Sequence, residues 1–147
     1  MLSPTVRAER VVPAEPQVVF DLLADPARHP ELDGSGSVRR ALDGNPERLS
    51  KGARFSMDMK LGVSYRISNL VVEFDEPRQI AWRHFAGHRW RYTLTPVDGG
   101  TLVQEEWDPS RVPHLWLYFR LTRTPARNQA GMEATLERLA DLVAPRA

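Results

Sequence analysis

The stretch that decides the fold is Ile80–Leu94, IAWRHFAGHRWRYTL, in which aromatic side chains alternate with arginines around a single glycine. Such alternation is typical of β-strands with one buried face, and the glycine indicates a hairpin turn. A two-residue turn at Ala86 and Gly87 would mix aromatic and arginine side chains on both faces. A three-residue loop, Ala86–His88, gathers the aromatic residues on one face if Gly87 is left-handed, so we predict that register.

A third strand extends this pattern through a four-residue loop at Val97–Gly100. The predicted inward-facing rows are Ile80–Leu94–Val103, Trp82–Tyr92–Glu105 and His84–Trp90–Trp107. On the outer face Arg91 then lies opposite Glu106, and opposite charges across a strand pair are stabilising. A carboxylate in an apolar interior is costly unless it is paired or hydrated, so Glu105 predicts a cavity behind the aromatic face.

The rest of the chain completes an α+β arrangement. We predict a first strand over Val6–Val12, two short helices over residues 15–32 and further strands from Val38 to Trp107, with a bulge near Asn69. The last segment is a long helix for which Thr124 and Pro125 supply the cap and the first turn. Its apolar stripe consists of Met132, Leu136, Leu139 and Val143. Gly131 interrupts this helix, which indicates close packing, a nearby ligand or a tolerated surface glycine.

Composition indicates one soluble domain over residues 1–147. The chain has 41% hydrophobic and 27% charged residues, a balance typical of globular proteins. Its formal net charge is +1, from 20 basic and 19 acidic residues, so no nucleic-acid partner is expected. It has no cysteine, and no apolar run approaches the ~20 residues of a membrane span. We therefore expect a cytoplasmic protein with no disulfide and no stable membrane insertion.

Neither a metal nor a cofactor is expected. The four histidines, His29, His84, His88 and His114, have no metal-ligand spacing with acidic residues. No Lys-Ser/Thr helix follows the glycine-rich segments at residues 33–37 and 97–100, so these are turns rather than phosphate-binding loops.

Four ordered segments resemble one known superfamily. They are VPAEPQVVFDLLADPARHPEL (12–32), VVEFDEPRQIAW (71–82), DGGTLVQEEWD (98–108) and NQAGMEATLERLADLV (128–143). Together they resemble the START-like (Bet v 1-like, SRPBCC) superfamily, within its bacterial polyketide cyclase/dehydrase and lipid-transport family. The resemblance implies a helix-grip fold, in which a curved antiparallel sheet wraps around the long C-terminal helix and leaves an apolar cavity between them.

The inward-facing residues are then the candidate site. The predicted ligand-binding residues are Met57, Met59, Trp82, His84, Trp90, Tyr92, Glu105, Trp107, Met132 and Leu136. Glu105, His84 and Tyr92 match the polar cavity groups of the family's cyclases in type only, and they are the candidates for catalysis. The alternative interpretation is structural: aromatic core, a hydrated or paired carboxylate, and a histidine that only packs.

Two functions follow, from different classes. The first is binding of a hydrophobic or aromatic, lipid- or polyketide-like small molecule, and the second is a polyketide cyclase or dehydratase that moves protons with cavity residues. A closed core with no ligand is a third possibility. The apolar segment Pro113–Leu121 is interpreted as a lid, a homodimer or membrane contact, or a short packed helix.

Overall fold

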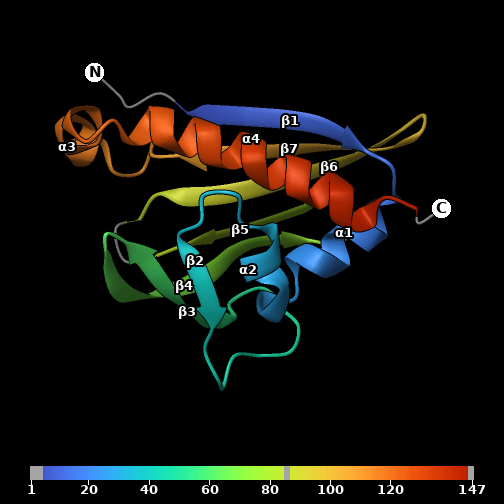
Figure 1. Cartoon of the computed structure of the whole chain (residues 1–147), viewed down its shortest axis with the longest axis horizontal. Helices are drawn as coiled ribbons and strands as arrows, with labels where there is room; N and C mark the ends of the chain where they lie inside the picture. The colour runs from blue at the N-terminus through green and yellow to red at the C-terminus, as the bar shows by residue number, and fades with distance from the viewer. Residues whose placement is uncertain (1–4, 85–86, 146–147) are drawn as a thin grey trace.

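A long C-terminal helix, α4 (Thr124–Val143), lies across an antiparallel sheet in the computed structural model, which describes residues 5–84 and 87–145 (Figure 1). The strands are β1 (Val6–Val12), β2 (Val38–Ala41), β3 (Arg54–Leu61), β4 (Val63–Asp75), β5 (Gln79–Arg83), β6 (Arg89–Val97) and β7 (Gly100–Asp108). Their order in the sheet is β1-β7-β6-β5-β4-β3-β2, so only β1 pairs out of sequence. The predicted α+β helix-grip architecture is confirmed.

One group of short helices follows β1 and covers one end of the sheet. A second group precedes α4 at the other end. They are α1 (Pro16–Leu23), the 3₁₀ turn η1 (Pro26–Arg28) and α2 (His29–Leu32) after β1, and η2 (Pro113–Leu115) and α3 (Trp116–Leu121) before α4. The Asp25 carboxylate accepts a hydrogen bond of 3.0 Å from the Ala27 backbone N–H, as expected of a helix cap. The prediction of two short helices after the first strand is therefore confirmed, with the second one starting as a 3₁₀ turn.

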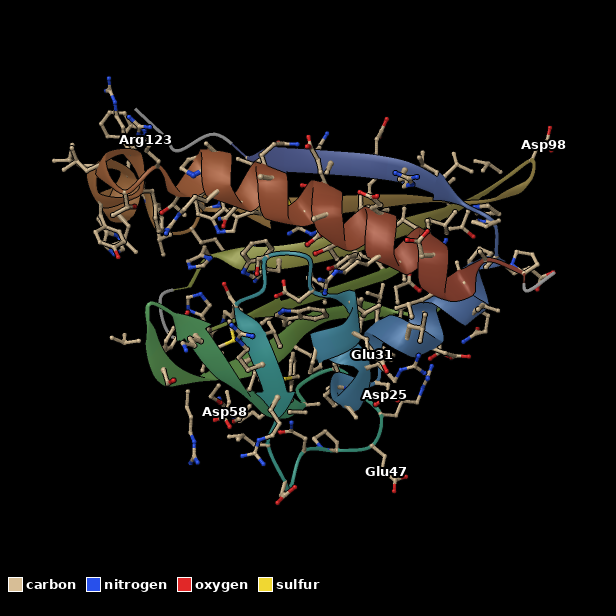
Figure 2. The ribbon with its side chains drawn as sticks, in the orientation of Figure 1. Asp25, Glu31, Glu47, Asp58, Asp98 and Arg123 are labelled. Atoms are coloured by element: carbon tan, nitrogen blue, oxygen red, sulfur yellow. The ribbon has the colours of Figure 1, made fainter. Side chains whose placement is uncertain are left out.

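Helix α4 begins differently from the prediction. Arg123, at the far end of the molecule from Asp98 in Figure 2, precedes the helix with a left-handed φ of 55°. Thr124 is therefore the first helical residue rather than the cap, because the sharp turn from α3 is made one residue earlier. The buried face of α4 consists of Met132, Thr135, Leu136, Leu139 and Ala140. Three of the four predicted stripe residues belong to it, and Val143 is half-buried at its end.

The pairing of β6 with β7 follows the predicted register. Leu94 lies opposite Val103, Tyr92 opposite Glu105, Trp90 opposite Trp107, and Arg91 opposite Glu106. This match fixes the position of Glu105 on the inner face of the sheet.

The predicted register of β5 with β6 is wrong by two residues. Ile80 lies opposite Tyr92 and Trp82 opposite Trp90. The last described pair is Arg83 with Arg89, so the connection between paired residues has five residues (84–88) rather than the predicted three (86–88). A shift of two leaves every side chain on its predicted face, so alternation alone cannot detect it. Of the predicted loop, Gly87 has the expected positive φ of 96°, and Ala86 lies outside the described residues.

Strand β4 contains the predicted change of phase, three residues later than expected. Its pairing with β3 is regular through Asn69, and the irregularity lies between Val71 and Glu73, against β5. The bulge therefore sits at Val72. Side chains that precede it at alternate positions, including Ile67 and Asn69, face the same side as the aromatic residues of β5 and β6.

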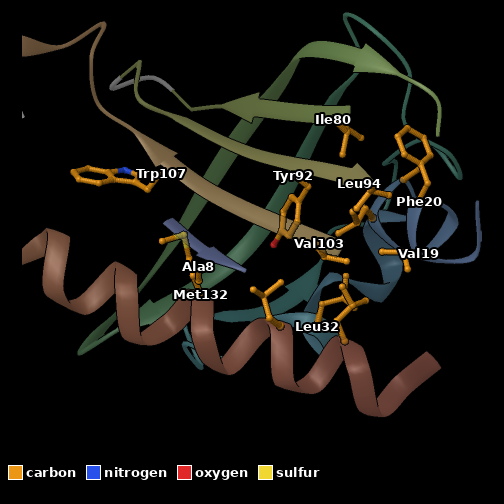
Figure 3. Close-up of a cluster of buried hydrophobic side chains, with 14 of the residues drawn as sticks. Ala8, Val19, Phe20, Leu32, Ile80, Tyr92, Leu94, Val103, Trp107 and Met132 are labelled. Carbon is orange, nitrogen blue, oxygen red and sulfur yellow. The ribbon is translucent and has the colours of Figure 1, made fainter. Parts of the chain in front are cut away.

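Close packing fills the end of the sheet next to α1. Val19 and Phe20 of α1 meet Ile80, Leu94 and Val103 of the sheet there, and all five are fully buried (Figure 3). The opposite end of the inner face is not filled in this way, and it forms the cavity described next.

Candidate functional site: a cavity between the sheet and α4

A cavity of about 530 Å³ lies between the inner face of the sheet, the loop after α2 and the N-terminal half of α4. This volume is within the range of pockets that hold small organic molecules. Its wall includes eleven aromatic, methionine and histidine side chains, together with polar groups from the sheet, the loop after α2 and α4.

Eight of the ten residues predicted to contact a ligand line this cavity. They are Met57, Met59, Trp82, His84, Trp90, Tyr92, Glu105 and Met132. The other two do not: Trp107 is 0% and Leu136 is 2% exposed, and both belong to the closed core. Trp107 packs edge-on against Phe119, with ring centroids 4.9 Å apart, because α3 covers that end of β7. The sequence patterns correctly predicted that Trp107 and Leu136 point inward. They did not predict that packing between the helices and the sheet separates both side chains from the cavity.

Glu105 is the carboxylate of the cavity wall, and it is 3% exposed. Burial raises its pKa to about 8, the nearby Asp33 adds to the rise, and the Tyr92 hydroxyl offsets part of it. Among the described residues, its Oε1 atom has no hydrogen-bond partner. At neutral pH the side chain is therefore mostly a neutral carboxylic acid with unused hydrogen-bonding capacity.

Tyr92 lies beside Glu105 on the neighbouring strand, and its hydroxyl points from the sheet toward α4 in Figure 3. Burial and the neighbouring carboxyl group raise its pKa well above the usual value, so the phenol stays protonated. Its ring is tilted against that of Trp82, with centroids 5.7 Å apart. Tyr92 thus supplies a hydroxyl next to Glu105 and an aromatic surface next to Trp82.

His29 belongs to the cavity wall, although it was not among the predicted ligand-binding residues. Its Nε2 donates to the Leu23 carbonyl oxygen at 2.8 Å, so this nitrogen carries the proton. Burial lowers its pKa, and the neutral ring stacks on Trp82 with a centroid distance of 5.0 Å. The Phe55 ring meets the His29 ring edge-on, with centroids 5.3 Å apart, which makes a continuous aromatic wall.

His88, also unpredicted, lies in the cavity wall and pairs with the buried Trp107 behind it. The Trp107 Nε1–H donates to His88 Nδ1 at 2.7 Å, and burial lowers the His88 pKa to about 3. The His84 ring meets the His88 ring edge-on at 4.1 Å, and burial lowers the His84 pKa as well. Both imidazoles are therefore neutral at pH 7, and each lines the cavity.

The loop after α2 is held onto α4 through backbone groups. The Gly34 N–H donates to Thr135 Oγ1 at 2.9 Å, and that hydroxyl donates to the Gly131 carbonyl oxygen at 2.9 Å. A Cβ on Gly34 would lie 2.4 Å from the Ala134 carbonyl carbon, so no other residue fits there without displacement. A Cβ on Gly131 would lie 3.2 Å from Ser35, which explains this glycine by close packing.

Comparison with known proteins identifies the family. Residues 3–144 match the sequence profile of the family described as polyketide cyclase / dehydrase and lipid transport. The chain belongs to this family. An uncharacterized protein of Mycobacterium tuberculosis strain H37Rv is 39% identical over 133 residues, which are 84% of this chain and 57% of that protein. The chain thus spans little more than half the length of this relative.

Solved structures share the fold of this family member at low sequence identity. A protein from Chromobacterium violaceum has a TM-score of 0.73 at 22% identity, covering 97% of this chain and 99% of the other. A polyketide-cyclase-like protein from Corynebacterium glutamicum has a TM-score of 0.59 at 17% identity, with 94% and 90% covered. These likenesses establish the fold.

The segment Pro113–Leu121 of this polyketide cyclase/dehydrase family member is a 3₁₀ turn followed by α3, beside the N-terminal end of α4 (Figure 1). Phe119 anchors it and is 4% exposed. Leu117, Tyr118 and Leu121 are 57%, 61% and 74% exposed. The short packed helix of the sequence interpretation is present, and it carries an apolar outer face.

The outer face of the sheet holds charges rather than a site. Glu73 accepts hydrogen bonds of 2.7 Å from both Arg89 and Arg91, and these hydrogen bonds lower its pKa to about 2. Asp58 forms ion pairs with Arg40 at 3.0 Å and Arg66 at 3.3 Å and lies at the outside of the molecule in Figure 2.

Residues 5–84 and 87–145 contain neither a metal-binding cluster nor a membrane-spanning helix. No group of three or more histidine, cysteine or acidic side chains there is arranged to hold a metal ion. In the same part of the chain, no helix combines the length and the apolar character that crossing a membrane requires.

Proposed function

We propose that this chain binds a small, largely apolar molecule that carries a hydrogen-bonding group, in the cavity between the sheet and α4. The observation that carries the proposal is Glu105 Oε1, a buried polar atom without a partner among the described residues, in the wall of an aromatic cavity of about 530 Å³. An unpartnered buried polar atom costs ~1–3 kcal/mol. A ligand that supplies the missing hydrogen bond offsets this cost.

The apolar part of the ligand has suitable surfaces on both sides of Glu105. Trp82, Trp90 and Tyr92 present ring faces or edges to the cavity, and such rings favour stacking with flat or polycyclic molecules. Met57 and Met59 are flexible and polarisable, so this part of the wall adapts to different shapes. Trp107 and Leu136 support the wall from behind rather than contacting the ligand.

Nile red, a neutral apolar dye, tests the proposal. We expect saturable one-to-one binding by the wild type, followed by dye fluorescence. Ile67→Trp fills part of the cavity and should weaken binding at least about tenfold, whereas Val63→Trp, on the same strand but 73% exposed and outside the cavity, should not. Circular dichroism verifies that both variants are folded.

Two results would contradict the proposal. One is an absence of dye binding by the wild type, and the other is equal binding by Ile67→Trp and wild type. To separate the cavity from the apolar face of α3, Leu117→Ser serves as a further variant, because it reduces that face without touching the cavity. Weaker binding in this variant alone would place the dye on α3 and refute the cavity.

A second candidate function is an enzyme of the cyclase or dehydratase type, which the family description includes. The observation that favours it is a buried carboxyl group with a pKa of about 8 beside a phenol, since proton transfer is most efficient near the working pH. Catalysed exchange of the α-protons of 2-tetralone in D₂O, followed by NMR, tests it. Exchange that is lost in Glu105→Gln while binding persists supports an enzyme; no exchange above background by the wild type argues against it.

A further inference from the structure

The charges of the cavity wall are unequal in sign. Among the described residues that line it, Arg127 supplies the basic side chain and Asp33 and Glu105 the acidic ones. Arg127 lies at the rim, where its exposed guanidinium donates to Thr124 Oγ1 at 3.3 Å. Asp33 is half-buried in the loop after α2, where its carboxylate accepts hydrogen bonds from Ser35 and Val38. The buried acidic group of the described wall is therefore Glu105, for which that wall has no matching buried cation.

The three histidines of the wall do not supply a positive charge. His29 uses its Nε2–H on the Leu23 carbonyl oxygen, and His88 accepts from Trp107 through Nδ1. Burial lowers the pKa of both rings and of His84, so a proton added to any of them at neutral pH is unfavourable. These rings offer neutral hydrogen-bonding surfaces, not counter-ions.

This distribution of charge selects among ligands of the same shape. An anion that enters the cavity gives up its hydration, which costs several kcal/mol unless a cation or several donors replace the water. It would meet Asp33 and Glu105 instead. A neutral hydroxyl needs only one partner, which Glu105 Oε1 can supply.

We propose that the cavity takes neutral molecules bearing a hydroxyl or similar donor and excludes carboxylates and other anions of equal size. The inference deepens the proposed binding function and rests on it. It assigns the ligand a charge class: an uncharged aromatic or aliphatic alcohol or a phenol rather than a free fatty acid or other organic acid.

Raising the pH should sharpen this selectivity, because Glu105 then becomes negative. The groups that face it are Tyr92 on β6, Ala8 opposite it on β1 and Asp33 after α2, while α4 contributes Met132 and the uncharged Thr135. None of these is a cation that could neutralise the new charge. Arg127, at the rim, is the basic group that α4 adds to the wall.

The test uses two probes of nearly the same shape, 2-naphthalenemethanol and 2-naphthoate, with isothermal titration calorimetry at pH 7 and pH 9.5. The alcohol is neutral and the acid is anionic at both values. We expect the alcohol to bind wild-type protein at least about tenfold more tightly at pH 7, with a larger ratio at pH 9.5. In Glu105→Gln, which cannot ionise, the ratio should be the same at both pH values.

The possible failures are distinguishable. If neither probe nor Nile red binds the wild type, the proposed binding function itself fails. If Nile red binds and the naphthoate binds as tightly as the alcohol, binding stands and the charge selectivity is refuted. If the naphthoate binds this tightly, the Arg127→Gln variant shows where it binds. The variant weakens naphthoate binding at the rim and leaves naphthoate binding in the interior unchanged, and both outcomes overturn the proposal.

Discussion

Replacing Glu105 by Gln should make the protein more stable at pH 8 while changing it little at pH 5. The carboxyl group has a pKa of about 8 in the folded protein, against 4.5 in the unfolded chain. Below pH 4.5 the carboxyl group is protonated in both states, and its contribution to the free energy of unfolding is complete. Between pH 4.5 and 8 only the unfolded state releases the proton, so the free energy of unfolding falls over that interval. At ~1.4 kcal/mol per pH unit, this interval corresponds to a loss on the order of 5 kcal/mol.

Glutamine has nearly the same shape and stays neutral, so it keeps the packing but removes the titration. The free energy of unfolding, from urea titrations followed by tryptophan fluorescence at pH 5, 6, 7 and 8, should therefore diverge between the two proteins. By pH 8 the wild type should have lost ~4 kcal/mol relative to the variant. Other groups, including the buried histidines and Glu73, titrate in both proteins and cancel in this difference.

The matched control is Glu137→Gln, an exposed carboxylate on α4. Its unfolding free energy should follow the wild type at every pH. If the curves of Glu105→Gln and wild type ran parallel from pH 5 to 8, Glu105 would be ionised and hydrated in the folded state. The reasoning from burial and from the unpartnered Oε1 would then be wrong.

Two further substitutions test the surroundings of the cavity. Gly34→Ala forces a Cβ against the Ala134 backbone and should cost ~1–3 kcal/mol, seen as a lower thermal midpoint; an unchanged midpoint would show that the loop adjusts freely. Trp107→Phe removes the donor to His88 and should cost ~1–3 kcal/mol more in urea unfolding than Trp90→Phe, its aromatic control. Equal costs for the two variants would mean that the hydrogen bond contributes nothing.

The alternating sequence of β6 and β7 was sufficient to predict their pairing residue by residue. Both strands carry a clear inner and outer face, and the opposition of Arg91 and Glu106 excluded a shift. The β5–β6 register had no such constraint, because Arg83 lies opposite another arginine, Arg89. An alternating pattern determines which face of the sheet a side chain points to. Only a specific cross-strand pair or a known loop length determines which residue of the neighbouring strand lies opposite it.

The part of the site contributed by α2, the loop after it and the residue before β6 could not be predicted. His29 and Asp33 belong to a short helix and the loop after it, and His88 precedes a strand, so none of them takes part in a periodic pattern. They reach the cavity through tertiary packing. The same limit explains Trp107 and Leu136, whose inward direction was evident but whose distance from the cavity depends on how α3 and α4 close over the sheet.

The ion network on the outer face has a consequence for how the protein can diverge. Glu73 on β4 and the two arginines Arg89 and Arg91 on β6 link these strands across β5 on the outer face. The cavity on the other face is shaped by side chains such as Met57 and Ile67. Substitutions at these inner positions alter the cavity without breaking a single outer ion pair. A few point mutations on the inner face can thus change which ligand the cavity binds while the backbone of the sheet stays the same. This is possible because the residues of the outer ion network and the residues that line the cavity are different positions in the chain.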